Sequence, residues 1–267
     1  MDLRQDWAIG RTALVTGATS GFGAAMARRV LAAGGKVIAT GRRKERLEAL
    51  NDPRWADRLF TVALDVTEPD CGAKLLAALP EAFGAIDILF NNAGLSLGLE
   101  PAYKTNLADW EQMIATNVSG MARITHAVLP GMVERRAGHV IMVGSVAANW
   151  PYPGGNVYGA TKAFVKQFSL NLRSELLGTP VKVTVLEPGA CETEFSMVRF
   201  AGDEARAAAV YADMKPLSAE DVIDSVEAVL RLPAHLNVNV LEIMPVQQAF
   251  AGFAIDRSGA NGPGTGN

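Results

Sequence analysis

The sequence predicts an α/β protein with a single domain built on a doubly wound, seven-stranded parallel sheet. Short apolar segments alternate with helical segments along the chain, and these short segments are almost continuously apolar, as strands buried on both faces are. The first such segment runs directly into a glycine-rich turn and then into an alanine-rich helix. The length of 267 residues is also typical of one α/β domain.

Apolar segments bounded by turn residues are predicted to form the strands, and helices are predicted in most of the intervals. In such a sheet ligands bind outside the carboxyl ends of the strands, so we expect functional residues there. The predicted strands are Thr12–Thr16, Lys36–Thr40, Phe60–Leu64, Ile86–Asn91, His139–Gly144, Lys182–Leu186 and Asn237–Met244, and the clearest helices are Leu107–Arg135 and Val157–Leu177.

The turn after the first strand reads Gly17-Ala-Thr19-Ser20-Gly21-Phe22-Gly23. Its glycines permit a tight turn and a close backbone approach, and the N-terminus of the following helix can face a pyrophosphate. The spacing is GxxxGxG, which differs from the general dinucleotide fingerprint GxGxxG. An ordinary strand-to-helix turn is therefore the alternative interpretation.

Arg42 and Arg43 follow the second strand, about twenty residues after the glycine turn. A site for NAD has a carboxylate near this position, whereas a site for NADP has arginine for the 2′-phosphate. No Asp or Glu occurs between Val37 and Lys44, and an arginine can grip a phosphate with two hydrogen bonds. The sequence thus favours NADP, although a solvated start of the next helix would also account for two arginines.

Tyr158 and Lys162 are four residues apart in a predicted helix, and Ser145 follows the fifth strand. Residues i and i+4 share one helix face, so the ammonium group can lie close to the phenol. A nearby cation favours the phenolate and lowers the pKa of a tyrosine toward the range useful for proton transfer. Ser145 can hold a substrate oxygen beside that phenol.

Taken together, these motifs resemble the short-chain dehydrogenase/reductase family over nearly the whole chain, which implies a Rossmann fold. The resemblance implies a catalytic tetrad of Asn117, Ser145, Tyr158 and Lys162, with Asn117 joining a water path to solvent. It also implies that Asp65 contacts the adenine ring and that Lys162 anchors the ribose. The cofactor-binding residues implied by the motifs and the resemblance are Gly17, Thr19, Ser20, Gly21, Phe22, Gly23, Arg42, Arg43, Asp65, Val66, Asn92, Ala93, Gly94, Tyr158, Lys162, Pro188, Gly189 and Thr193.

Within that family, the segments 150–158, 193–200 and 232–245 are similar to the NADP-dependent 3-hydroxy acid dehydrogenases. The resemblance implies reversible hydride transfer between NADP and a small 3-hydroxy acid, such as serine, L-allo-threonine or 3-hydroxyisobutyrate, or the reverse reduction of malonic semialdehyde. Ala190 and Cys191 stand where larger aliphatic residues are expected, so the substrate side of the pocket is roomier. A carbonyl reductase of broad specificity and a non-catalytic NADP-sensing scaffold are the alternatives; the intact Ser145, Tyr158 and Lys162 argue against the scaffold.

The segment 190–218 interrupts the alternation of strands and helices and is predicted to be a substrate lid, with a surface helical excursion as the alternative. Arg199 in this segment is a candidate for recognising a substrate carboxylate, because its planar fork matches a carboxylate. Trp150 and Tyr152 are candidates for the substrate pocket, although aromatic packing is nearly as good an account of them.

The composition and net charge of the chain limit the kinds of partner and the cellular locations that we expect. The net charge of −3 and the lack of a basic cluster beyond residues 42–44 argue against nucleic acid, and three scattered histidines offer no metal-ligand spacing. No segment of about 18 apolar residues and no signal segment is found, so a cytoplasmic protein without membrane partners is expected. We assign residues 1–257 to the catalytic domain and 258–267 to a disordered tail. Helices 107–135 and 157–177 carry apolar residues on two faces, and the resemblance implies that they pair subunits, so a homotetramer is expected.

Overall fold

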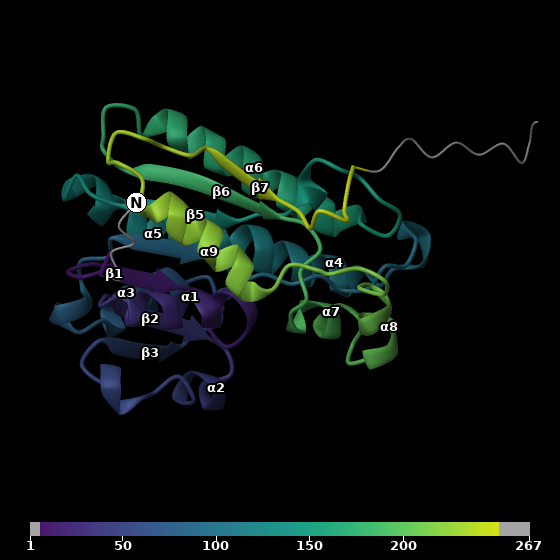
Figure 1. The fold of residues 1–267 in the computed structure, drawn as a ribbon, viewed down its shortest axis with the longest axis horizontal. Helices are drawn as coiled ribbons and strands as arrows, with labels where there is room; N and C mark the ends of the chain where they lie inside the picture. The colour runs from purple at the N-terminus through teal and green to yellow at the C-terminus, as the bar shows by residue number, and fades with distance from the viewer. Residues whose placement is uncertain (1–5, 251–267) are drawn as a thin grey trace, which may run out of the picture.

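The computed structural model describes residues 6–250, so the predicted tail at 258–267 lies outside the described part. Seven strands form one sheet in the order β3-β2-β1-β4-β5-β6-β7, and neighbouring strands are parallel throughout (Figure 1). The predicted doubly wound sheet is confirmed. The strands are β1 Thr12–Val15, β2 Lys36–Gly41, β3 Leu59–Ala63, β4 Ile88–Asn91, β5 His139–Val143, β6 Lys182–Pro188 and β7 Val240–Ile243.

Helices cover both faces of the sheet, and each face has its own apolar core. Helices α1 (Gly21–Ala32), α2 (Lys44–Glu48) and α9 (Ala219–Leu230) contribute to one core, together with alternate strand residues such as Val15. Helices α3 (Cys71–Ala78), α5 (Met121–Glu134) and α6 (Asn156–Glu175) contribute to the other core. Short 3₁₀ turns at Pro53–Trp55, Glu81–Phe83, Ala102–Lys104 and Val146–Ala148 join some of these elements.

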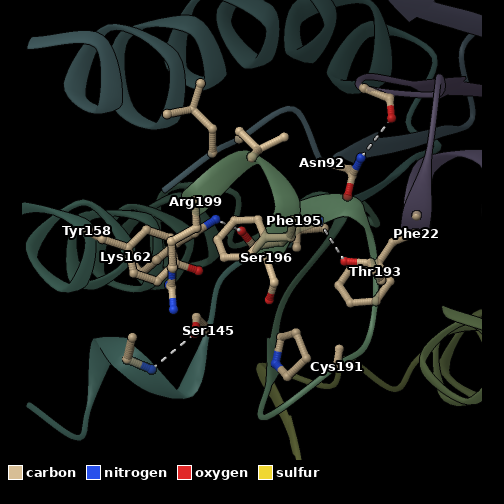
Figure 2. Close-up of a pocket in the computed structure, with 18 of the residues that line it drawn as sticks. Phe22, Asn92, Ser145, Tyr158, Lys162, Cys191, Thr193, Phe195, Ser196 and Arg199 are labelled. Atoms are coloured by element: carbon tan, nitrogen blue, oxygen red, sulfur yellow. Dashed lines mark hydrogen bonds between the residues drawn. The ribbon is translucent and has the colours of Figure 1, made fainter. Parts of the chain in front are cut away.

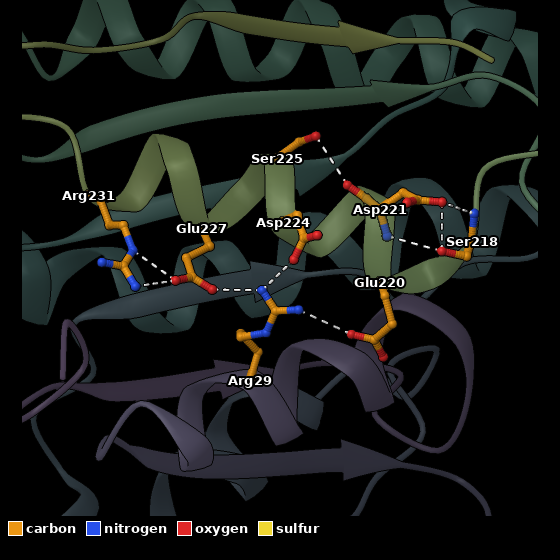
Figure 3. Close-up of polar contacts among 8 residues, drawn as sticks. All are labelled: Arg29, Ser218, Glu220, Asp221, Asp224, Ser225, Glu227 and Arg231. Carbon is orange, nitrogen blue, oxygen red and sulfur yellow. Dashed lines mark hydrogen bonds and ion pairs between the residues drawn. The ribbon is translucent and has the colours of Figure 1, made fainter. Parts of the chain in front are cut away.

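An ion-pair cluster holds α1 against α9 (Figure 3). The Arg29 guanidinium on α1 donates to Asp224 at 2.6 Å, to Glu227 at 2.7 Å and to Glu220 at 3.2 Å, all on α9. Ser218 begins α9 as the N-terminal residue of a capping box with Asp221, which fixes where the helix starts. The two halves of the sheet are therefore tied together on this face.

The helix predicted at 107–135 is present, but it contains a π-helical turn. Helix α4 (Leu107–Ile114) continues through a π-helical segment, Ala115–Gly120, into α5. Such turns are rare and often occur at functional sites. The buried Asn117 lies inside this one.

The segment 190–218 folds into two short helices, α7 (Glu194–Arg199) and α8 (Glu204–Ala209). The seventh strand starts later than the predicted Asn237, because the Asn237 amide pairs with the backbone N–H and carbonyl of Val183, each at 2.9 Å, in place of a backbone ladder. Within residues 6–250, none of the helices combines the length and apolarity that crossing a bilayer demands.

Candidate active site

A cavity of about 590 Å³ extends from the glycine turn after β1 to helix α7 (Figure 2). The carboxyl ends of β1, β2, β4, β5 and β6 contribute to it, as expected for a doubly wound sheet. The predicted site residues that line it are Gly17, Thr19, Ser20, Gly21, Phe22, Arg42, Arg43, Asp65, Val66, Asn92, Ala93, Gly94, Ser145, Trp150, Tyr152, Tyr158, Lys162, Pro188, Gly189, Thr193 and Arg199. Two predicted residues, Gly23 and Asn117, stand behind its wall.

Gly23 is required for packing of the glycine turn. A Cβ atom there would lie 2.2 Å from the carbonyl oxygen of Gly17, so no other residue fits. Gly17 itself has a φ of +65°, which favours glycine. The Asn92 amide donates to the carbonyls of Thr16 at 2.9 Å and Gly17 at 3.2 Å and so fastens the turn to the end of β4.

The N-terminus of α1 opens into the cavity, which Ser20, Gly21 and Phe22 line. The first N–H groups of a helix have no partner inside the helix, and Ser20, which precedes α1, does not cap them with its side chain. The Thr40 and Thr116 hydroxyls at the cavity wall also have no hydrogen-bond partner among the described residues. This end of the cavity therefore fits a ligand with phosphate and hydroxyl groups.

Arg43 spans the outer edge of the glycine turn. Its Nε and Nη2 donate to the Thr19 hydroxyl at 3.2 and 2.8 Å, and Nη2 also donates to the Ser20 hydroxyl at 2.9 Å. Nη1 donates to Glu194 at 3.0 Å. Arg42 is exposed beside it. The two predicted arginines thus lie next to the glycine turn, where a phosphate on the ribose of a dinucleotide would be reached.

Tyr158 is buried at the centre of the opposite end of the cavity, close to Ser145, Lys162 and Arg199 (Figure 2). Burial raises the pKa of the Tyr158 phenol to about 12, although the charge of Arg199 and a hydrogen bond with Ser145 act in the opposite direction. The Ser145 oxygen accepts a hydrogen bond from the Ala147 N–H at 3.1 Å, which fixes its position at the end of β5.

The expected lowering of the Tyr158 pKa by Lys162 is not found. The Lys162 ammonium donates to the Val143 carbonyl at 2.7 Å and lies 5.8 Å from the centre of the Tyr158 ring. Burial lowers the pKa of Lys162 to about 8 and raises that of the phenol. The burial of both groups outweighs their nearness, and the cation that acts on the phenol is Arg199.

Asn117 supports the wall of the cavity. Its amide oxygen accepts from the Leu95 N–H at 2.9 Å, and its nitrogen donates to the Leu95 carbonyl at 2.8 Å and to the Thr161 hydroxyl at 3.1 Å. A Cβ atom on Gly94 would lie 3.2 Å from the Asn117 oxygen and 3.5 Å from the Lys162 nitrogen. The π-helical turn thus positions the Asn117 amide behind Gly94, on the same side as the Lys162 ammonium.

Arg199 reaches from the end of α7 toward Tyr158. Its guanidinium carbon lies 5.2 Å from the centre of the Tyr158 ring and 5.0 Å from that of Phe195. Nε donates to the Ser96 hydroxyl at 3.1 Å, and Nη2 donates to the Tyr152 hydroxyl at 3.4 Å. A positive, planar donor group is therefore held beside the phenol.

The remaining candidates around this end have structural partners as well. Trp150 is partly exposed and packs on Phe250 with ring centres 4.2 Å apart. Cys191 lines the cavity, and burial raises the pKa of its thiol to about 12. The Asp65 carboxylate accepts from the N–H and hydroxyl of Thr67 at 2.9 and 2.8 Å, so it is held at the cavity edge.

Gln248 and Glu194 are among the residues of this site that sequence reasoning missed. Gln248 accepts a hydrogen bond from the Ala190 N–H at 2.7 Å, and a Cβ atom on Gly189 would lie only 2.3 Å from its oxygen. Glu194 pairs with both Arg43 and Arg46. Nothing in the spacing of either residue indicated these contacts. Among the described residues, no cluster of His, Cys, Asp or Glu could hold a metal ion.

Comparisons with known proteins agree with this geometry. The family model described as short chain dehydrogenase matches residues 11–204. The chain is 55% identical to the NADP-dependent 3-hydroxy acid dehydrogenase YdfG of Salmonella typhi over 246 residues, which are 92% of this chain and 99% of that protein. It is 51% identical to the serine 3-dehydrogenase of Rhizobium radiobacter over 246 residues, 92% of this chain and 98% of that protein. A closed form of serine dehydrogenase complexed with NADP+ is similar in structure, with a TM-score of 0.90, 55% identity, and coverage of 92% of this chain and 99% of that one.

Proposed function

Because the chain belongs to the short-chain dehydrogenase family, we propose that it is an NADP-dependent oxidoreductase that transfers a hydride reversibly between NADP and a small 3-hydroxy acid. The observation that carries the proposal is one cavity that joins a phosphate-binding glycine turn to a buried Tyr158 with Arg199 beside it. The first end suits a dinucleotide, and the second suits an alcohol or carbonyl compound that carries a carboxylate. Residues 1–257 would form the catalytic domain, with 190–218 as its lid.

Protein residues would bind the cofactor at four places. The N-terminus of α1 and the glycine turn would hold the pyrophosphate, and Arg42 and Arg43 would hold the 2′-phosphate. Asp65 and Val66 lie where the adenine would rest, and the nicotinamide end would lie between Gly94 and the Pro188-Gly189 turn with Thr193. The bound nicotinamide would accept or return the hydride.

Tyr158 would exchange the proton with the substrate oxygen. With a pKa near 12 the phenol is protonated at neutral pH, so it is ready to donate a proton to a carbonyl oxygen during reduction. In the oxidative direction the phenolate would accept the alcohol proton, and Arg199 would favour that ionised form. Ser145 would orient the substrate oxygen, and Lys162 and Asn117 would complete the polar wall on the ribose side.

Arg199 would bind the substrate carboxylate, and this contact would suit the cavity to a 3-hydroxy acid. The relatives whose names specify a 3-hydroxy acid and serine are oxidoreductases for substrates with a carboxylate close to the reacting hydroxyl. A guanidinium about 5 Å from the phenol ring matches that separation in a small molecule. Trp150 and Tyr152 would form the rest of the substrate wall.

A carbonyl reductase of broader specificity is the second candidate. The small side chains of Ala190 and Cys191 line the cavity where larger residues would narrow it, and Phe195 adds an apolar surface. Such a pocket would accept uncharged ketones larger than malonic semialdehyde.

An assay that monitors the formation of NADPH by its absorbance tests both candidate functions. We expect oxidation of serine, L-allo-threonine and 3-hydroxyisobutyrate with NADP and much slower oxidation with NAD. Comparable rates on uncharged secondary alcohols would favour the carbonyl reductase. Absence of turnover on the whole panel, with NADP bound, would contradict both candidates and favour a binding protein.

We also propose that the protein is a cytoplasmic homotetramer. Phe164 and Phe168 on α6 stack with ring centres 5.6 Å apart, and Phe164 is 40% exposed. Leu107 and Ile114 on α4 are exposed as well, so two neighbouring helices present apolar surface that a second copy would cover. Both cysteines are free, as is usual in a reducing compartment. Light scattering should give four times the chain mass of 28.3 kDa, and a monomer at micromolar concentration would contradict the proposal.

A further inference from the structure

An ion-pair cluster connects helix α7 to the arginines beside the glycine turn. Glu194 is the first residue of α7, and its carboxylate accepts hydrogen bonds from Arg43 Nη1 at 3.0 Å and from Arg46 Nη1 on α2. Arg43 immediately precedes α2, so both arginines belong to one short segment. The segment 190–218 is therefore fastened at its start to the arginine that would bind the 2′-phosphate.

The Arg43 guanidinium presents one edge to an anion, and Glu194 occupies that edge. Its Nε and Nη2 are engaged with the hydroxyls of Thr19 and Ser20, and the Nη1 edge faces Glu194. The side chains of Arg43 and Glu194 are 42% and 41% exposed, and both line the cavity. The hydrogen bonds with Arg46 and Arg43 hold the pKa of Glu194 below its ordinary value, so the residue is a carboxylate at neutral pH.

We propose that Glu194 is a specificity-determining residue that competes with the 2′-phosphate of the cofactor for Arg43 and thereby limits the preference for NADP over NAD. This inference rests on the proposed function, because only NADP carries that phosphate. A carboxylate and a phosphate that share one guanidinium repel each other across a distance well within a Debye length of about 8–10 Å. NAD places no such charge there, so its binding is insensitive to Glu194 through this route.

Arg46 gives Glu194 a second partner during the competition. When the phosphate engages Arg43, the carboxylate keeps its ion pair with Arg46. Helix α7 would therefore stay anchored to α2 while Arg43 turns to the phosphate. Removal of Arg46 would leave Glu194 with Arg43 alone and strengthen the competition.

Calorimetric titration of NADP and NAD into the full-length variant Glu194→Gln tests the inference. The amide is nearly isosteric but uncharged, so we expect the ratio of the NAD to the NADP dissociation constant to rise by about two- to five-fold, the range of a partly exposed ion pair. Any loosening of α7 would change the affinity for both cofactors by the same factor and cancels in this ratio. Glu192→Gln, an exposed residue two positions earlier, removes the same charge and should leave the ratio unchanged.

A second variant predicts the opposite direction. Arg46→Gln should lower the ratio, and this effect should shrink in the double variant with Glu194→Gln. A ratio that is unchanged or lower in Glu194→Gln would overturn the inference while leaving the proposed function intact. A wild-type protein that binds NADP no better than NAD would contradict the proposed cofactor and this inference together.

Discussion

Replacement of Arg199 by methionine separates recognition of the carboxylate from proton transfer. Arg199 has five N–H donors, and two of its nitrogens, Nε and Nη2, are each engaged in one hydrogen bond, with Ser96 and Tyr152. At least one edge of the fork is therefore left for a substrate carboxylate. Methionine is flexible and apolar, so it can fill the space beside the Tyr158 and Phe195 rings.

The expected loss follows from the charge of the missing hydrogen bonds. Hydrogen bonds to charged groups contribute about 1.5–3 kcal/mol, and about 1.4 kcal/mol corresponds to tenfold, so the loss is on the order of 10- to 100-fold. It should appear in kcat/KM for serine or 3-hydroxyisobutyrate, mostly through KM. Loss of Arg199 also removes a cation that lowers the pKa of Tyr158, so the pH profile of the oxidation rate should shift toward higher pH for every substrate.

The assay therefore compares each acid with an uncharged secondary alcohol in the same variant and at the same pH. The change in the pKa of Tyr158 affects both substrates equally, so it cancels in the ratio of the two kcat/KM values. The ratio therefore reports only the recognition of the substrate carboxylate. Arg206→Met on α8 is the matched control, because Arg206 also stacks on an aromatic ring, that of Phe200, but does not line the cavity. An equal loss on charged and uncharged substrates would refute the reasoning and leave Arg199 as a support for α7.

Three further predictions follow from the same structure. Tyr158→Phe should reduce turnover by at least about 100-fold while NADP still binds, since the phenol acts on the reacting proton; turnover within a few-fold of the parent would remove it from the mechanism. Replacement of Arg42 and Arg43 together by glutamine should weaken the binding of NADP by tens of fold or more and that of NAD only slightly, because each charged hydrogen bond to the 2′-phosphate contributes about 1.5–3 kcal/mol. Steady-state kinetics measured in parallel with both cofactors would check this. Burial lowers the pKa of His139 to about 3, so the unfolded chain binds a proton that the folded protein does not, and stability should fall by up to ~1.4 kcal/mol per pH unit as the pH drops below about 6.5. His139→Gln can keep the contact with Thr184 and does not titrate, so its urea midpoint should vary less between pH 7.5 and 5; parallel profiles would contradict this origin.

The sequence predicted the sheet well because apolar periodicity is a local signal. Each strand lies within a few residues of its predicted position, and the largest difference occurs at β7. There the Asn237 side chain imitates the backbone hydrogen bonds of a strand with Val183, a residue 54 positions away. A contact of this kind has no trace in local composition.

The sequence predicted which residues line the site better than it predicted their pKa values and the charges around them. The spacing placed Lys162 one helical turn from Tyr158, and both residues line the cavity. The spacing could not reveal that both are buried, which drives the pKa of the phenol up and that of the ammonium down. Nor could it show that Arg199, on a helix far along the chain, supplies the positive charge beside the phenol.

The π-helical turn at Ala115–Gly120 exists only with the present number of residues in this segment. A π turn accommodates about one residue more than an α turn, so deletion of one residue from this segment would restore a regular α-helix. Because the π turn already absorbs the extra residue, the same deletion would leave the helices on either side in nearly their present orientation. Met113, now fully buried, would keep its place in the core, whereas the Asn117 amide, which lies in the turn itself, would lose its hydrogen bonds with Leu95. At this position a more regular helix would thus keep the packing of the core and remove a support of the cavity wall.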